Sequence, residues 1–132
     1  MSYETCRRRE SVMNEVLEDV AASGDWRIPA KWRQEIEETF GGEAGFAVAL
    51  YARWFAALTV RLDPVLEAPP ADLPDAAARA ARQLAREHPA LSALLADYLD
   101  HPALAEARRR ERRYFDWAPG AQLASLAPLV PA

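Results

Sequence analysis

The sequence is poor in cysteine and histidine. Among its 132 residues, Cys6 is the single cysteine, and His88 and His101 are the two histidines. One cysteine can form no intramolecular disulfide and no thiolate metal cluster, which favours a reducing compartment. Residues 1–7 also lack the apolar core of a secretory signal. We therefore expect a cytoplasmic protein with no bound metal and no cofactor.

The two histidines suggest a metal site, because acidic residues lie near each of them in the sequence. However, His88 and His101 stand thirteen residues apart, and each directly precedes a proline. Ligands that share an ion usually lie on one helical face, four residues apart, and this spacing does not provide that. A role at the start of a helix is the better interpretation.

Glycine is scarce, and the serines lack a nucleophile motif. The five glycines follow no predicted strand, so no phosphate-binding loop is expected. The serines show no pattern of a hydrolase. Glu35, Glu37 and Glu38 are close in sequence, but they fall on the polar side of a predicted helix, which favours a solvated face over acid–base chemistry. We predict no catalytic residue, and the pattern favours a binding protein over an enzyme.

Lysine is nearly absent, and charge is unevenly distributed. Lys31 is the one lysine among sixteen basic residues, and the formal net charge of −4 argues against a general binder of polyanions. Nine acidic and three basic residues lie from Glu10 to Gly45, whereas five arginines and three acidic residues lie from His101 to Trp117. The acidic first half and the basic last helix could complement each other within a homodimer.

Apolar residues, in contrast, are abundant. They make up 51% of the chain, enough for a single domain with a real core. Their spacing predicts helices over residues 10–22, 28–40, 43–68, 75–87, 89–99 and 102–117, the fourth with Asp75 as its N-cap. Proline-rich residues 68–74 predict a stiff connector. We expect an all-α domain over residues 1–117, a compact bundle of five to six helices, and a tail over residues 118–132.

The third predicted helix, about residues 43–66, is apolar on nearly every side. Its main row contains Phe46, Leu50, Trp54, Leu58 and Leu62. Such a helix is normally buried by several partners or by a second subunit. Charged residues interrupt it before it reaches the roughly 20 apolar residues that cross a bilayer, so we expect a core helix and no membrane span. A proline at position 64 favours an early end near Leu62.

Arg53 stands among aromatic residues in this apolar helix. Its guanidinium could bind an anionic ligand in a pocket walled by Tyr51 and Trp54. The alternative is that Arg53 extends to solvent or forms an internal ion pair, with Asp97 or Glu67 as its partner. Together with Arg61, it could also mark a polar seam at a subunit interface.

The last predicted helix is rich in arginine and ends in aromatic residues. This pattern suggests nucleic-acid binding by Arg108, Arg109, Arg110, Arg112 and Arg113. Glu106 stands four residues before Arg110 and can pair with it, which favours a solvated helix instead.

Three functional hypotheses follow, of which the first is preferred. It is a non-enzymatic helical interaction protein that forms a homodimer, or binds a protein partner, through the apolar third helix and the C-terminal aromatics. The second is a DNA-binding regulator that uses the arginine-rich last helix. The third is a protein or enzyme that binds a small anionic ligand beside Arg53.

Overall fold

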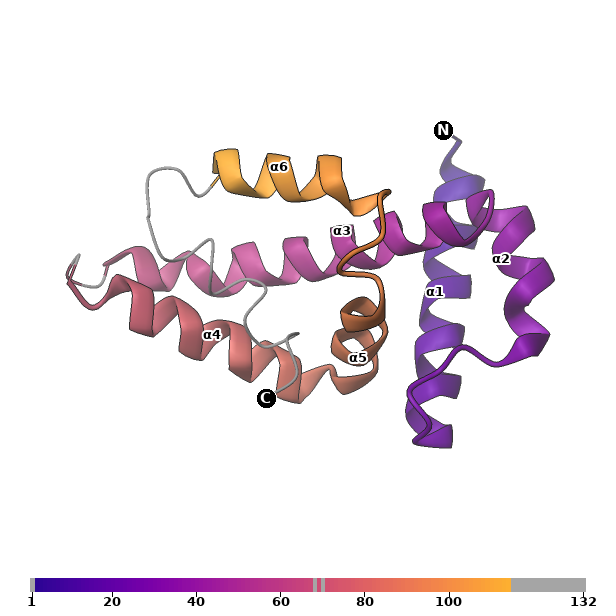
Figure 1. The fold of residues 1–132 in the computed structure, drawn as a ribbon, viewed down its shortest axis with the longest axis horizontal. Helices are drawn as coiled ribbons and strands as arrows, with labels where there is room; N and C mark the ends of the chain where they lie inside the picture. Colours follow the sequence, from indigo (N-terminus) through magenta and orange to yellow (C-terminus); the bar gives the residue numbers. More distant parts are fainter. Residues whose placement is uncertain (1, 68, 70, 115–132) are drawn as a thin grey trace.

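The computed structural model describes residues 2–67, 69 and 71–114, and the predicted tail over residues 118–132 lies outside them. Within this part, six α-helices and two short 3₁₀ helices follow one another, and no strand occurs (Figure 1). The prediction of an all-α bundle is confirmed.

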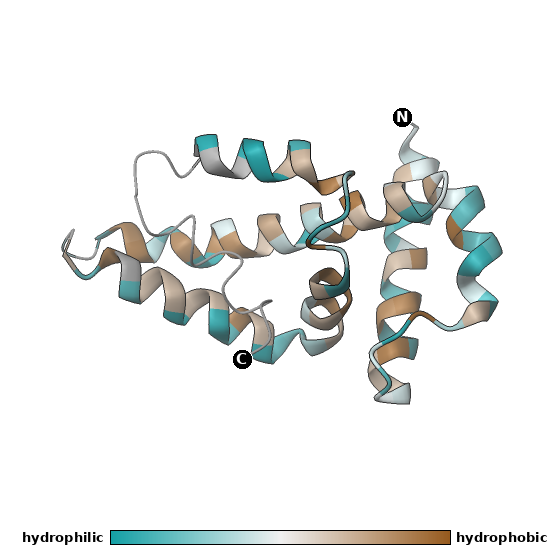
Figure 2. Ribbon diagram, in the orientation of Figure 1, coloured by the Kyte–Doolittle hydropathy of each residue, from teal (hydrophilic) through white to brown (hydrophobic). Residues whose placement is uncertain are grey.

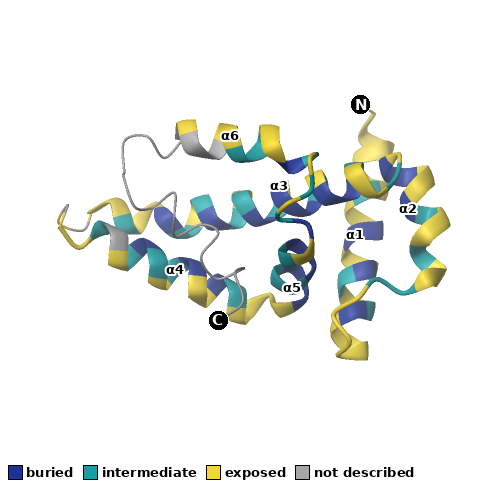
Figure 3. Ribbon diagram, in the orientation of Figure 1, coloured by how far each residue is buried: buried dark blue, intermediate teal, exposed yellow. Residues whose placement is uncertain are grey.

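The central element is α3, which spans Glu43–Leu62. It packs against α2, α4, α5 and α6. The predicted row Phe46, Leu50, Trp54, Leu58 and Leu62 is buried (Figure 3). The helix ends at Leu62, and the 3₁₀ helix η2 at Pro64–Glu67 follows, because a proline at position 64 has no backbone N–H to continue the α-helical hydrogen bonds. The predicted central helix and its early end are thus confirmed.

By length and composition alone, Glu43–Glu67 is long and apolar enough to cross a membrane. A core helix of a compact helical protein meets the same criterion. In this fold Phe46, Leu50 and Trp54 of α3 are buried, whereas Val48 and Val60 are exposed. Of the most apolar stretch of this segment, 39% is buried.

The first helix begins earlier than predicted. α1 spans Tyr3–Ser23, because the Ser2 hydroxyl accepts a hydrogen bond from the backbone N–H of Thr5 at 3.1 Å and caps the charged N-terminal turns. Its buried side chains include Val12, Met13, Val16 and Val20. The helix ends at Gly24, whose φ of 68° is left-handed.

The second helix begins later than predicted. A 3₁₀ turn, η1, covers Ala30–Trp32, and α2 covers Arg33–Phe40. The segment before it bends sharply, since Trp26 has a φ of 55°, which is rare for a bulky residue. α2 packs against α1 and α3, and its buried residues Ile36 and Phe40 continue the predicted apolar row.

The remaining helices are α4 at Leu73–Glu87, α5 at Pro89–Asp97 and α6 at Leu104–Tyr114. Asp72, and not Asp75, is the N-cap residue of α4. Small buried residues Ala77 and Ala81 let α4 pack against α3, and an ion pair between Arg61 and Glu87 joins the same two helices. Beyond its first turn, α6 is mostly hydrophilic (Figure 2).

Candidate functional site

One side of α3 remains uncovered by the described residues. Val48, Ala52, Ala56 and Val60 stand four residues apart on this side and are exposed, with Val48 40% and Val60 71% exposed. We call these four residues the α3 face. It contains no charge and extends along a helix whose opposite side forms the core, so its exposure does not result from fraying.

Two hollows border the α3 face. The α1-side hollow, of about 510 Å³, is lined by Arg9, Glu10, Met13 and Arg53 together with residues of the face. The α6-side hollow, of about 260 Å³, adds Tyr51, Phe55, Ala107 and Arg110 to Val48 and Ala52. The α3 face is therefore a ridge between the two hollows, and side chains of another helix can fit into them.

Arg53 lies on the α1 side of α3 and is bound within the chain. Its guanidinium donates hydrogen bonds to Asn14 Oδ1 at 2.7 Å and to Glu10 Oε1 at 2.5 Å. An internal ion pair therefore forms, but with Glu10 instead of the predicted Asp97 or Glu67. Sequence reasoning could not identify this partner, because 43 residues separate the two.

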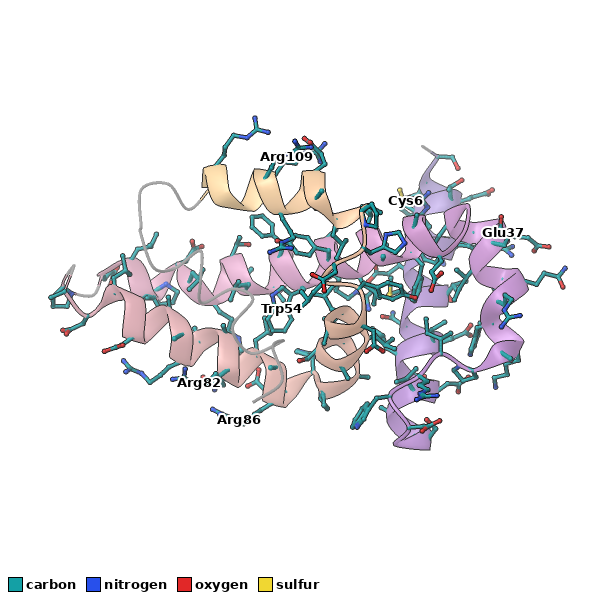
Figure 4. The ribbon with its side chains drawn as sticks, viewed as in Figure 1. Cys6, Glu37, Trp54, Arg82, Arg86 and Arg109 are labelled. Atoms are coloured by element: carbon teal, nitrogen blue, oxygen red, sulfur yellow. The ribbon has the colours of Figure 1, made fainter. Side chains whose placement is uncertain are left out.

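The three predicted ligand-binding residues do not line one hollow. Trp54 is fully buried in the interior (Figure 4), and Tyr51 is 3% exposed, whereas Arg53 lies on a different side of α3. This divergence follows from helical geometry, since residues 51 and 53 project in nearly opposite directions. Tyr51 instead lines the α6-side hollow with Arg110. Its buried Oη has no hydrogen-bond partner among the described residues.

The arginines of α6 are largely engaged by one carboxylate. Glu106 lies 2.8 Å from Arg109, 3.7 Å from Arg110 and 3.8 Å from Arg113. Arg108 donates to the Leu99 carbonyl at 3.2 Å, and the side chain of Arg112 lies outside the described part. The expected pairing of Glu106 with Arg110 is present, and Arg109 lies on the outer surface of α6 (Figure 4).

Of the two histidines, His101 forms a contact at a helix start, whereas the side chain of His88, between α4 and α5, forms no cap hydrogen bond to a described residue. No cluster of three metal-ligating side chains occurs among the described residues. His101 Nδ1 accepts a hydrogen bond from the backbone N–H of Ala103 at 3.1 Å, which matches the predicted role before a helix. Glu35 pairs with Arg8 at 2.9 Å. The indole N–H of Trp32 donates a hydrogen bond to Asp19, and Lys31 forms an ion pair with it; both contacts lower the pKa of Asp19, the hydrogen bond more strongly. The same contacts join η1 to α1.

Sequence reasoning proposed the third helix as a contact surface but did not identify which side of it stays open. The signal available was side-chain size. The large residues Phe46, Leu50 and Trp54 fall on the buried side, whereas alanine and valine form the exposed row. Comparisons with protein-family models, with curated proteins and with solved structures each find no match to this chain.

Proposed function

We propose that this chain is a non-enzymatic helical interaction protein that forms a homodimer through the α3 face. The observation that carries the proposal is the uncharged row Val48, Ala52, Ala56 and Val60, exposed along the core helix. Exposed apolar rows of this kind are typical of interaction surfaces. Small side chains at positions 52 and 56 allow the backbone of a facing helix to approach closely.

The exposed row extends along much of α3. A helix of 20 residues is about 30 Å long, and the row from Val48 to Val60 covers about 18 Å of it. A standard interface buries roughly 800 Å² on each partner, so a dimer through the α3 face would also cover the two hollows beside it.

The test is the change Ala52→Glu. Ala52 is exposed in the single chain, so a carboxylate there leaves the fold intact but would be buried between two copies. We expect light scattering at micromolar concentration to give twice the chain mass of 14.7 kDa for the wild type, and the single mass for the variant. Ala22→Glu, at an exposed position near the end of α1, is the control and should remain dimeric. A monomeric wild type, or equal masses for both variants, would contradict the proposal.

The two other functions predicted from the sequence receive less support. Arg53 already satisfies its guanidinium with Glu10 and Asn14, so an anionic ligand would have to displace them. Glu106 offsets part of the positive charge that nucleic-acid binding would use. Neither function gains an observation of its own.

A further inference from the structure

A second concave surface lies away from the α3 face, between α2 and α5. This α2–α5 cleft has a volume of about 590 Å³, within the range of small-molecule sites. Its floor is apolar and is formed by Ile28, Ile36, Phe46 and Leu94. Three of these four side chains are buried, so the floor belongs to the core. The cleft is therefore built on rigid elements.

Charged side chains of both signs border this cleft. Arg27 and Arg33 lie on the side of η1 and α2, and neither forms an ion pair with another described residue. Glu37, on α2 (Figure 4), and Asp97, at the end of α5, are likewise without an ion-pair partner in the described part of the chain. Unpaired arginines and carboxylates at the border of an apolar floor are available to a ligand.

The fifth charged group of the cleft is already engaged. Glu43 accepts a hydrogen bond from the Tyr98 hydroxyl at 3.1 Å. Burial, and then the charge of Glu43, raises the pKa of Tyr98, which therefore keeps its proton. The hydrogen bond from the neutral hydroxyl leaves the charge of Glu43 in place, so two cations and three anions border the cleft. Groups of both signs at one border suit a ligand that itself carries both charges, a zwitterion.

We infer that the α2–α5 cleft binds a short zwitterionic peptide with apolar side chains. Its carboxylate would bind Arg33, assisted by Arg27, its ammonium group would bind Asp97 on α5, and its side chains would cover Ile36 and Phe46. Trp26, which directly precedes Arg27, has a left-handed backbone with a φ of 55°. Strained residues of this kind often occur beside binding sites. The inference is independent of the homodimer.

The probe is the dipeptide Leu-Leu, measured by isothermal titration calorimetry against the full chain. We expect saturable binding in the millimolar range or tighter. Arg33→Gln should weaken binding about tenfold through loss of a charge-assisted hydrogen bond. Asp97→Asn should weaken it similarly, and both residues are exposed, so the fold should survive. Arg82→Gln is the matched control, because Arg82 is an exposed arginine on α4, outside the cleft (Figure 4).

Blocked peptides test the two ends separately. N-acetyl-Leu-Leu lacks the ammonium group, and Leu-Leu amide lacks the carboxylate. Each should bind about tenfold more weakly than Leu-Leu. Asp97→Asn should no longer affect the acetylated peptide, and Arg33→Gln should no longer affect the amide. Absence of saturable binding by Leu-Leu, or equal binding by all three peptides, would overturn the inference.

Discussion

At the scale of single residues, two tyrosines in the same fold differ in how their hydroxyls are satisfied. Tyr98 donates to Glu43 at 3.1 Å, whereas the buried Oη of Tyr51 has no hydrogen-bond partner among the described residues. A buried polar group without a partner costs about 1–3 kcal/mol. Both rings contribute to the core, so their hydroxyls can be removed with little change in packing.

Replacing each tyrosine with phenylalanine should therefore change stability in opposite directions. We expect Tyr51→Phe to raise the free energy of unfolding by about 1 kcal/mol, because it removes an unsatisfied hydroxyl. Tyr98→Phe should lower it by about 1–2 kcal/mol, because it removes a hydrogen bond to a carboxylate. Urea unfolding of both variants measures the difference. If Tyr51→Phe were as destabilising as Tyr98→Phe, the Tyr51 hydroxyl would have a partner in solution.

At the scale of elements, the corner between α2 and α3 depends on one glycine. A Cβ at Gly45 would overlap the backbone carbonyl oxygen of Phe40, the last residue of α2. The rings of Phe40 and Phe46 meet edge to face at this corner, with centroids 5.2 Å apart. The close approach of the two helices therefore requires a residue with no side chain.

Gly45→Ala should destabilise the protein, although helix propensity predicts the opposite. Alanine gains about 1 kcal/mol over glycine inside a helix. Here the added methyl meets backbone that cannot move freely, and such overpacking costs about 1–3 kcal/mol. We therefore expect Gly45→Ala to lower the free energy of unfolding, measured with urea, by about 1 kcal/mol. Ala44→Gly, at the exposed neighbouring position, should lower the free energy of unfolding by about as much through helix propensity alone. Stabilisation by Gly45→Ala would show that the corner relaxes.

The helices themselves could largely be predicted from sequence, because apolar spacing and proline act locally. The row from Phe46 to Leu62 and the end of α3 before the proline at position 64 follow from these signals. The first residues of the helices were harder to predict from the sequence. α1 begins at Tyr3 because Ser2 caps it, a signal hidden among charged residues, and α4 begins after Asp72 instead of Asp75.

At the scale of the whole molecule, contacts between segments distant in sequence determine which side of a helix is covered and which charged residues meet, and the sequence alone does not give these contacts. Periodicity identifies α3 as apolar but does not tell which side its neighbours cover. The pairing of Arg53 with Glu10 results from where α1 lies relative to α3, whereas the separation of Tyr51 from Arg53 follows from their spacing on the helix. The charged border of the α2–α5 cleft likewise combines side chains from separate elements, with Arg33 on α2 and Asp97 on α5.

The proposed homodimer predicts that thermal stability depends on protein concentration. When association is linked to folding, mass action raises the melting temperature as concentration rises. For a chain of this size, a tenfold increase should raise Tm by about 2–4 °C. The wild type and the control Ala22→Glu should both show this increase in differential scanning calorimetry, whereas Ala52→Glu should melt at a constant temperature. Because Ala52 is exposed in the single chain, the variant should still melt cooperatively. An identical concentration dependence in all three proteins would place any association elsewhere than the α3 face.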